Sequence, residues 1–479
     1  MTQIGTPDNP VRVAIVGAGP SGFYAAEHIL KDAETFAQVD LFDRLPTPYG
    51  LVRGGVAPDH PKIKSVTRVY ERTAAREGFR FFGNVKVGQD IEVEDLERLY
   101  HAIVYTFGCE TDRRLGIPGE ELPGSHAATA FVGWYNAHPD FADREFDLSA
   151  ERVVVIGNGN VAADVARMLA LPRAELDTTD TADHAIEPLA RAGVREIVVL
   201  GRRGPAQAAF TNPEVRELGE MTIADVIVDP GDMELDPVSR EFVDSDDCDP
   251  TNRRNVEIFT EFSTREPEGK PKRIALRFLR SPVEIKGDGK VESIVLGVNE
   301  LYRDESGGIR ARDTGEREEI KCGLVLRSIG YAGESLEGLP FDERRATIAN
   351  ERGRVVDADS GEQVEGLYVT GWIKRGPSGV IGTNKKDAQE TVDAIFEDLE
   401  AGKIPEPSAD PGTPGSEAEE VAGIDVLLAE RQPDAVSFQG WQAIDEAEKS
   451  AGEPQGRPRV KFCSIAEMVE AARGAPVGG

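Results

Sequence analysis

The feature that most constrains the fold is a glycine turn that occurs twice, each time between a short apolar run and a helical pattern. The first copy follows the β-branched run at residues 11–16, where Gly17, Gly19 and Gly22 have the spacing G-x-G-x-x-G. In this pattern the first glycine makes a tight turn, the second lets the backbone approach a pyrophosphate, and the third lets helix and strand pack closely. The segment therefore predicts a strand, a dinucleotide-binding turn and a helix.

The acid that follows this turn indicates which nucleotide it binds. A second expected strand, residues 39–42, ends on Asp43, which lies 21 residues beyond Gly22 (43 − 22). A carboxylate at the end of this strand accepts hydrogen bonds from ribose hydroxyls and repels a 2'-phosphate. The first turn is therefore expected to hold an adenosine without that phosphate, as in FAD or NAD.

The second glycine turn carries the opposite signal. Residues 153–156 form an expected strand, and residues 157–162 read G-N-G-N-V-A before a helical pattern. The next expected strand, residues 197–200, is followed by Arg202 and Arg203 instead of an acid. Two guanidiniums suit a 2'-phosphate because each offers paired, charge-assisted donors. The second turn therefore predicts NADP(H), although an acidic stretch makes the connection to the arginines longer than in the simple motif.

Two such units predict an α/β protein with two Rossmann-like dinucleotide-binding domains, the two-dinucleotide-binding flavoprotein fold. A chain of 479 residues exceeds a single hydrophobic core. Apolar runs at 324–329 and 367–370 bring the chain back to buried strands, so the first domain is expected to be discontinuous. We assign residues 1–111 and 337–479 to an FAD-binding domain and residues 112–336 to an NADP-binding domain. This pairing describes NADPH reducing a flavin.

Three segments outside the turns are expected to have no catalytic role. Residues 229–250 are crowded with acids and turn residues, and residues 404–420 are rich in Pro, Gly, Ser and Glu. Both compositions are typical of surface loops. Residues 424–472 show two amphipathic helical patterns.

Charge and cysteine content restrict the remaining chemistry. The formal net charge is -31, from 86 acidic and 55 basic residues, which argues against binding to nucleic acid or to an anionic membrane. No apolar run approaches the roughly 18 residues of a membrane span, and no leader is apparent, so we expect a cytoplasmic protein. The four cysteines are scattered singly, without a C-x-x-C pair for a metal, an iron-sulfur cluster or a redox disulfide. We therefore expect no metal, and an electron acceptor outside the chain.

Several longer motifs are far more specific than either glycine turn. They are PTPYGLVRGGVAPDHP at 46–61, FGNV at 82–85, NGNV at 158–161, GRRGP at 201–205 and GWIKRGPSGVIGT at 371–383. With these motifs, nearly the whole chain resembles the adrenodoxin reductase type of ferredoxin-NADP reductase, and its actinobacterial members in particular. The sequence departs from the family in having Asp43 where glutamate is usual and in an acidic segment near Asp244. The resemblance implies hydride transfer from NADPH to FAD and then single-electron transfer to a ferredoxin-type carrier.

The resemblance also implies site residues. FAD contacts are implied at Ser21, Asp43, Leu51, Val87, Trp372, Gly379, Val380 and Ile381, beside the turn of Gly17, Gly19 and Gly22. NADP contacts are implied at Asn158, Gly159, Asn160, Val161, Arg202, Arg203, Glu214 and Gly379, with Arg113 as a further candidate. His60 and Glu214 are the candidate catalytic residues, as polar groups close to the transferred hydride.

The chemistry of residues 376–382 agrees with this assignment. They form a glycine-rich turn ahead of a helix expected from about residue 384. The amides and the positive dipole end of that helix can face an anion and favour a reduced, negatively charged flavin. Gly379 leaves room for a nicotinamide ring to approach the flavin.

Other functions remain open at this point. A flavin-dependent monooxygenase would share both nucleotide folds and would differ in product-coupled oxygen use. A glutamate-synthase-like module would carry cysteine clusters, which are absent. A non-catalytic nucleotide-sensing protein would bind NADPH without reducing ferricyanide. For a carrier, the candidate docking cations are Lys62, Lys64 and Arg68 on one expected helix, with Arg216, Lys374 and Arg375.

Overall fold

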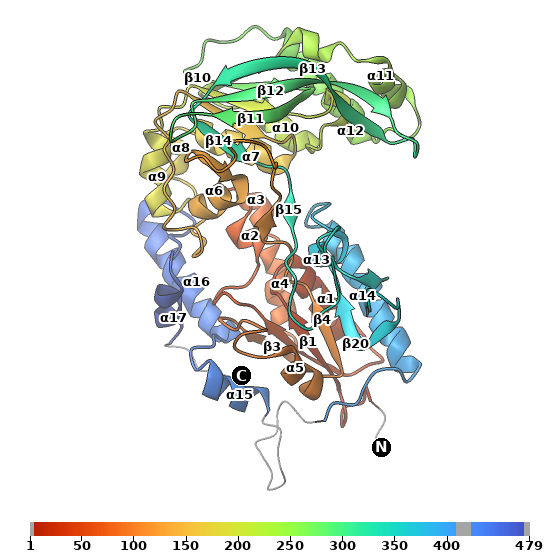
Figure 1. Ribbon diagram of the computed structural model, residues 1–479. Coiled ribbons are helices and arrows are strands. Elements are labelled where there is room, and N and C mark those ends of the chain that lie inside the picture. Colours follow the sequence, from red (N-terminus) through yellow and green to blue (C-terminus); the bar gives the residue numbers. More distant parts are fainter. Residues whose placement is uncertain (1–3, 409–422, 474–479) are drawn as a thin grey trace. The chain divides into compact units, whose positions relative to one another are not determined.

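A computed structural model describes residues 4–408 and 423–473 (Figure 1). The chain divides into two compact units. The first unit comprises Met1–Val56, His60–Thr111 and Gly330–Gly479, and the second comprises Ala57–Asp59 and Asp112–Ile329. The return to the first unit therefore lies at Gly330, ahead of the boundary at residue 337 that we expected.

The first unit is built on a seven-stranded sheet with the order β18-β19-β20-β4-β1-β2-β3. Its strands are β1 (Val11–Val16), β2 (Ala37–Phe42), β3 (Phe79–Phe82), β4 (Ala102–Tyr105), β18 (Asn350–Glu351), β19 (Arg354–Val356) and β20 (Gln363–Val369). Strands β20, β4, β1, β2 and β3 are parallel to one another. Strands β19 and β18 extend the sheet beyond β20 with antiparallel pairing. Strand β1 is central and almost fully buried, which explains its uninterrupted apolar sequence.

Helices and a short hairpin complete the first unit. The helices are α1 (Pro20–Lys31), α2 (Leu51–Gly54), α3 (Pro61–Lys64), α4 (Thr67–Ala74), α5 (Val93–Leu99), α13 (Trp372–Arg375), α14 (Thr383–Glu400), α15 (Ile424–Arg431), α16 (Phe438–Gly452) and α17 (Ile465–Ala472). The hairpin pairs β16 (Phe341–Asp342) with β17 (Thr347–Ile348). Helix α1, which follows the first glycine turn, packs against α14, so two segments far apart in the sequence lie side by side (Figure 1).

The second unit contains a six-stranded parallel sheet with the order β6-β14-β7-β8-β10-β9. Its strands are β6 (Ser125–Ala127), β7 (Arg152–Ile156), β8 (Glu196–Leu200), β9 (Ala224–Val228), β10 (Lys272–Arg277) and β14 (Leu324–Arg327). Its helices are α6 (Ala128–Tyr135), α7 (Asn160–Ala170), α8 (Arg173–Leu176), α9 (Asp183–Ala190), α10 (Asn212–Gly219), α11 (Pro237–Asp244) and α12 (Pro250–Thr264). An antiparallel sheet of β11 (Arg280–Lys286), β12 (Ser293–Arg303) and β13 (Ile309–Lys321) belongs to the same unit and appears at the top of Figure 1.

Both expected strand–turn–helix units are present, as β1-α1 and β7-α7, which confirms the predicted fold class. The loop expected at residues 229–250 is wrong, because this segment contains α11. One of its acids caps this helix: Asp236 accepts hydrogen bonds from Val238 N and Ser239 N, and a proline follows it at the first helical position. The same Asp-Pro signal starts α12 at Asp249.

Two further expectations need correction. The basic helix expected to hold Lys62, Lys64 and Arg68 is split into α3 and α4. The two C-terminal helical patterns correspond to three helices, α15 to α17.

Of the loop expected at residues 404–420, residues 409–420 lie outside the described part of the chain. None of the helices in the described ranges combines the length and apolar character that crossing a membrane requires.

Candidate functional site

The first glycine turn has the geometry of a pyrophosphate cradle. Gly17 has φ +114°, and a Cβ there would meet the backbone of Phe107 at 2.6 Å. A Cβ on Gly22 would meet the carbonyl oxygen of Gly17 at 2.2 Å. In contrast, a Cβ on Gly19 would meet nothing within 4 Å. Close packing therefore requires glycine at positions 17 and 22. Gly19 instead leaves open space in front of the N-terminus of α1, where backbone amides attract a phosphate.

Asp43 follows β2 and is tied to the same turn. Its carboxylate accepts hydrogen bonds from Ala18 N at 2.8 Å and from Leu45 N at 2.9 Å. Burial raises the pKa of Asp43 to about 6, although both hydrogen bonds oppose the shift. The two donors fix the carboxylate beside the turn, and its remaining lone pairs can accept ribose hydroxyls.

We predict that FAD affinity depends on the ionisation of Asp43. Ribose hydroxyls bond best to the ionised carboxylate, so affinity should be full above a pH of about 6 and should fall below it. Removing the charge with Asp43→Asn should weaken FAD binding by about tenfold or more, the scale of one hydrogen bond to a charged group. Fluorescence titration of apoprotein with FAD at several pH values measures both effects. A parent affinity that stays constant through this pH range would contradict the assignment.

The segment 371–375 lies against the first turn. Gly371 has φ +79°, and a Cβ there would lie 2.2 Å from Ser21 Oγ. Asp387 of α14 holds this segment, because it accepts a hydrogen bond from Gly371 N at 2.6 Å and pairs with Lys374 and Arg375 at 2.8 and 2.5 Å. These ion pairs occupy both cations, so Lys374 and Arg375 are unsuited to the docking face that we expected.

Trp372 and the following glycine turn complete the implied FAD contacts of this region. Trp372 Nε1 is buried without a hydrogen-bond partner in the described ranges, and its ring lies 5.3 Å from that of Tyr331. An unpaired buried donor of this kind is what a bound isoalloxazine or ribityl oxygen would satisfy. Gly379 has φ +83°, and Val380 is 54% exposed. Helix α14 begins at Thr383, which confirms the expected helix after the turn.

The other implied FAD contacts differ in exposure. Leu51, at the start of α2, is 38% exposed, whereas Ser21 and Val87 are buried at 7%. Arg53 of α2 is held by Glu448 of α16 through hydrogen bonds of 2.9 and 2.5 Å, and the Glu448 side chain is fully buried. The C-terminal helices, to which we gave no catalytic role, thus anchor the segment that carries Leu51.

The second glycine turn repeats the first. Gly157 has φ +139°, and a Cβ would lie 2.0 Å from the carbonyl oxygen of Ser328, whereas a Cβ on Gly159 would meet only Ala209, at 3.9 Å. Two of its neighbours join it to the chain ahead of α10: Asn158 O accepts Ala209 N at 2.9 Å, and Asn160 Oδ1 accepts Thr211 N at 2.8 Å. Val161 continues α7. The open space beside Gly159 therefore lies in front of the N-terminus of α7, as the space beside Gly19 lies in front of α1.

Arg202 and Arg203 follow β8, as expected. Arg202 is exposed and Arg203 is half-buried. Burial lowers the pKa of Arg203, and the nearby charges of Arg202 and Arg310 lower it further. Over residues 4–408 and 423–473, neither Arg202 nor Arg203 has an acidic partner. Two neighbouring guanidiniums without an acidic partner are a favourable place for a phosphate. Arg113, the remaining candidate, is exposed.

Glu214 is positioned by a residue that the sequence analysis missed. Arg167 of α7 has a side chain only 5% exposed, and its Nη1 lies 3.3 Å from Glu214 Oε2. The same guanidinium pairs with Asp59 at 2.5 Å and with Asp164 at 2.8 Å. Burial opposes its charge, but these carboxylates raise the pKa of Arg167. The local sequence gave no signal for this role, because Asp59 and Glu214 come from distant segments, although Asp164 lies on α7 itself.

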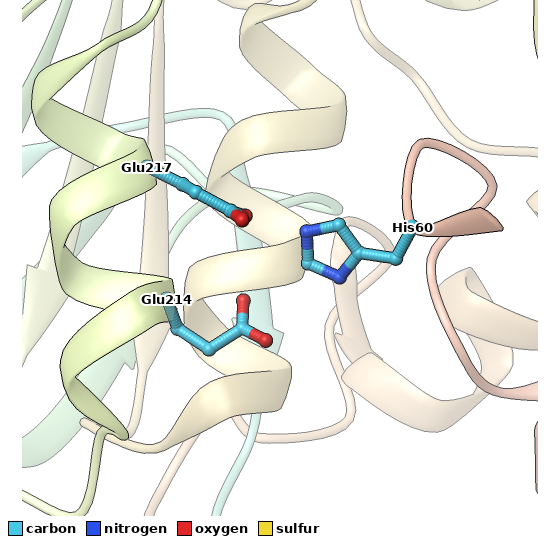
Figure 2. Close-up of side chains that lie close together, drawn as sticks. All are labelled: His60, Glu214 and Glu217. Atoms are coloured by element: carbon cyan, nitrogen blue, oxygen red, sulfur yellow. The ribbon is translucent and has the colours of Figure 1, made fainter. Parts of the chain in front are cut away.

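The two candidate catalytic residues belong to different units. His60 precedes α3 in the first unit and is 9% exposed. Glu214 lies in the first turn of α10 in the second unit, one turn from Glu217, and Figure 2 shows both carboxylates extending from the same side of that helix. The Glu217 side chain is 44% exposed, against 10% for Glu214.

Two nucleotide units, one with an acid and one with arginines after the second strand, define a pyridine-nucleotide-dependent flavoprotein oxidoreductase. Consistently, residues 11–200 match the family described as "Pyridine nucleotide-disulphide oxidoreductase". None of the four cysteines is paired in a disulfide.

More specifically, the chain belongs to the family of NADPH-dependent ferredoxin and adrenodoxin reductases. It is 51% identical to "NADPH-ferredoxin reductase FprA" of Mycobacterium tuberculosis, over 97% of this chain and 100% of that protein. It is 40% identical to the mitochondrial "NADPH:adrenodoxin oxidoreductase" of Salvelinus fontinalis, over 98% of this chain and 92% of that one. The structure of Mycobacterium tuberculosis FprA in complex with NADPH matches with a TM-score of 0.88 and 48% identity, over 97% of this chain and 100% of that chain. The resemblance stated from the motifs is thereby confirmed.

Proposed function

We propose that this protein accepts a hydride from NADPH, holds the electron pair on FAD, and passes the electrons singly to a ferredoxin-type carrier. The observation that carries the proposal is the contrast between Asp43 beside the first glycine turn and Arg202 and Arg203 beside the second. This contrast assigns a nucleotide without a 2'-phosphate to the first unit and NADP(H) to the second. When bound, FAD supplies the conversion between two-electron and one-electron transfer.

The residues of this chain would bind FAD and NADPH and orient them for hydride transfer. The turn at Gly19 and the carboxylate of Asp43 would hold the adenosine and pyrophosphate of FAD, with Trp372 and residues 379–381 toward its flavin end. The turn at 158–161 would hold the pyrophosphate of NADPH, and the arginine pair its 2'-phosphate. The N-terminus of α14 would favour negative charge on the reduced flavin.

His60 and Glu214 would orient the nicotinamide and balance charge, since direct hydride transfer needs no obligatory acid or base. Glu214 suits this role because Arg167 fixes its carboxylate in a buried position. Arg113 stays a candidate NADP contact.

We predict that Glu214→Gln slows the reduction of bound FAD by NADPH, or weakens NADPH binding, by about tenfold, the scale of one charged hydrogen-bond partner. Stopped-flow spectroscopy of the flavin absorbance separates the rate of reduction from the affinity for NADPH. The matched control is Glu217→Gln, on the same side of α10 but more exposed and farther from Arg167, at 3.9 Å against 3.3 Å, and it should reduce flavin like the parent. A parental rate and affinity in Glu214→Gln would remove this residue from the site.

The proposed activity is tested with purified protein, NADPH, and either ferricyanide or each ferredoxin of the host. NADPH-dependent reduction of both acceptors is expected. Failure to reduce ferricyanide would favour a nucleotide-sensing protein, whereas product-coupled oxygen consumption would favour a monooxygenase. The names of the relatives, NADPH-ferredoxin reductase and NADPH:adrenodoxin oxidoreductase, support an acceptor of the ferredoxin type. We propose the cytoplasm as its compartment, since none of the four cysteines forms a disulfide, as is typical of a reducing environment.

A further inference from the structure

The backbone of the arginine loop, residues 201–204, is held from outside by the turn between β10 and β11. Gly201 N donates to Arg277 O at 2.8 Å, and Arg280 N donates to Gly201 O at 3.0 Å. Leu279 N donates to Arg203 O at 3.1 Å. The loop that carries both guanidiniums is therefore attached through its backbone to a second loop.

That second loop is itself in a costly conformation. Leu279 has φ +56°, in the left-handed region that a branched residue seldom occupies. A residue persists there only when its surroundings hold it. Leu279 O accepts a hydrogen bond from Asn299 N of β12 at 2.9 Å, so the antiparallel sheet supplies part of that support.

Asn299 joins the two loops through its side chain. Its Nδ2 donates to Arg202 O at 2.8 Å and to Ser281 Oγ at 2.8 Å. The residue is 5% exposed, so the amide is shielded from competing water. A side-chain amide nitrogen has two donors, and both are used here. The Asn299 side chain thus fixes the carbonyl of the very residue whose guanidinium is exposed for a phosphate.

The hydrogen bond from Asn299 to the Arg202 carbonyl opposes an electrostatic repulsion within the arginine loop. Burial lowers the pKa of Arg203, and the neighbouring charges of Arg202 and Arg310 lower it further, so the loop holds like charges close together. An untethered loop would let the guanidiniums move apart and into water. A loop tethered at the Arg202 carbonyl keeps them together before the ligand arrives, which reduces the ordering cost of binding.

We infer that Asn299 is a positioning residue for cofactor selectivity: by holding the Arg202 carbonyl, it pre-organises the arginine loop for the 2'-phosphate of NADPH. The inference rests on the proposed function, in which Arg202 and Arg203 read that phosphate. It gives the β11-β12-β13 sheet a role in choosing NADPH over NADH, although Asn299 touches neither nucleotide.

The test compares Asn299→Ala with the parent for kcat/KM with NADPH and with NADH. The NADPH/NADH ratio is expected to fall by about threefold to tenfold, the range for one neutral hydrogen bond, with NADH use unchanged. The dissociation constant of adenosine 2',5'-bisphosphate, measured by calorimetry, should rise by the same factor. Loss of folding would lower kcat/KM with NADPH and with NADH by the same factor. A changed NADPH/NADH ratio therefore indicates lost positioning and not lost stability.

The matched control is Ser293→Ala at the other end of β12, where the buried Ser293 Oγ donates to Glu319 at 2.6 Å. It removes a hydrogen bond from the same sheet and should leave the ratio at the parental value. If Asn299→Ala folds too poorly to assay, Ser281→Ala removes only the second partner of the amide and should lower the ratio by a smaller factor.

The double variant Arg202→Ala with Arg203→Ala distinguishes the two possible failures. If that variant loses selectivity while Asn299→Ala keeps it, the inference about Asn299 is wrong and the proposed function stands. If the double variant keeps its selectivity, other residues bind the phosphate. The inference about Asn299 and the proposed role of the arginine pair are then both wrong. When both are correct, adding Asn299→Ala to the double variant should cause no further fall in the ratio, because the two act through one element.

Discussion

Replacing Arg202 and Arg203 together by alanine is expected to reduce the preference for NADPH over NADH by about a hundredfold. Each hydrogen bond to a charged group contributes about 1.5 to 3 kcal/mol, and the pair offers at least two such bonds to a 2'-phosphate. The net charge of -31 adds to the contrast, because a protein this acidic repels a phosphate away from the arginines.

The measurement is kcat/KM for both cofactors in parent and variant. Arg191→Ala is the matched control, since Arg191 lies in the same unit, is 82% exposed and pairs only with Glu187 among the ion pairs of the described chain. It removes one positive charge and should change the ratio little. Equal use of NADH by the parent, or an unchanged ratio in the double variant, would show that the arginine pair does not select the cofactor.

Arg167→Met is expected to give the largest loss of stability, about 3 to 5 kcal/mol in the free energy of unfolding, the cost of removing one partner of a buried ion pair. The change would leave the carboxylates of Asp59, Asp164 and Glu214 without their shared guanidinium. The loss arises because these buried carboxylates would then lack the counter-ion that offsets the cost of their burial.

Denaturant unfolding, followed by tryptophan and flavin fluorescence, measures this loss. Arg173→Met is the matched control, because Arg173 also pairs with two acids, Asp177 and Glu187, but its side chain is 53% exposed. Exposed pairs contribute little, so its unfolding midpoint should stay close to the parental value. An Arg167→Met protein with parental stability would mean that the buried guanidinium and its carboxylate partners contribute little to the stability of the fold.

The sequence was sufficient wherever the chemistry is local. A glycine turn between a strand and a helix is specified within residues 11–30, and the structure places β1 and α1 there. The residues that end the next strands, Asp43 and Arg202, could also be identified, because a parallel sheet brings the carboxyl ends of its strands to one edge. The Asp-Pro caps of α11 and α12 were local signals too, and the loop expected at 229–250 was wrong only because acid content outweighed them.

The supports of these sites depend on the tertiary structure. Arg167 meets Asp59 across 108 residues, Asn299 meets Arg202 across 97, and Arg53 meets Glu448 across 395. An arginine, an asparagine or a glutamate on an amphipathic element reads as a solvated surface residue, and nothing in its neighbours reveals that it becomes buried. The sequence by itself therefore determined the two nucleotide folds, because the backbone turns and strand ends that define them are encoded within a few residues. Only the tertiary structure decided what holds the site residues in place, because a buried charge or amide is tolerated only where distant segments supply its partners.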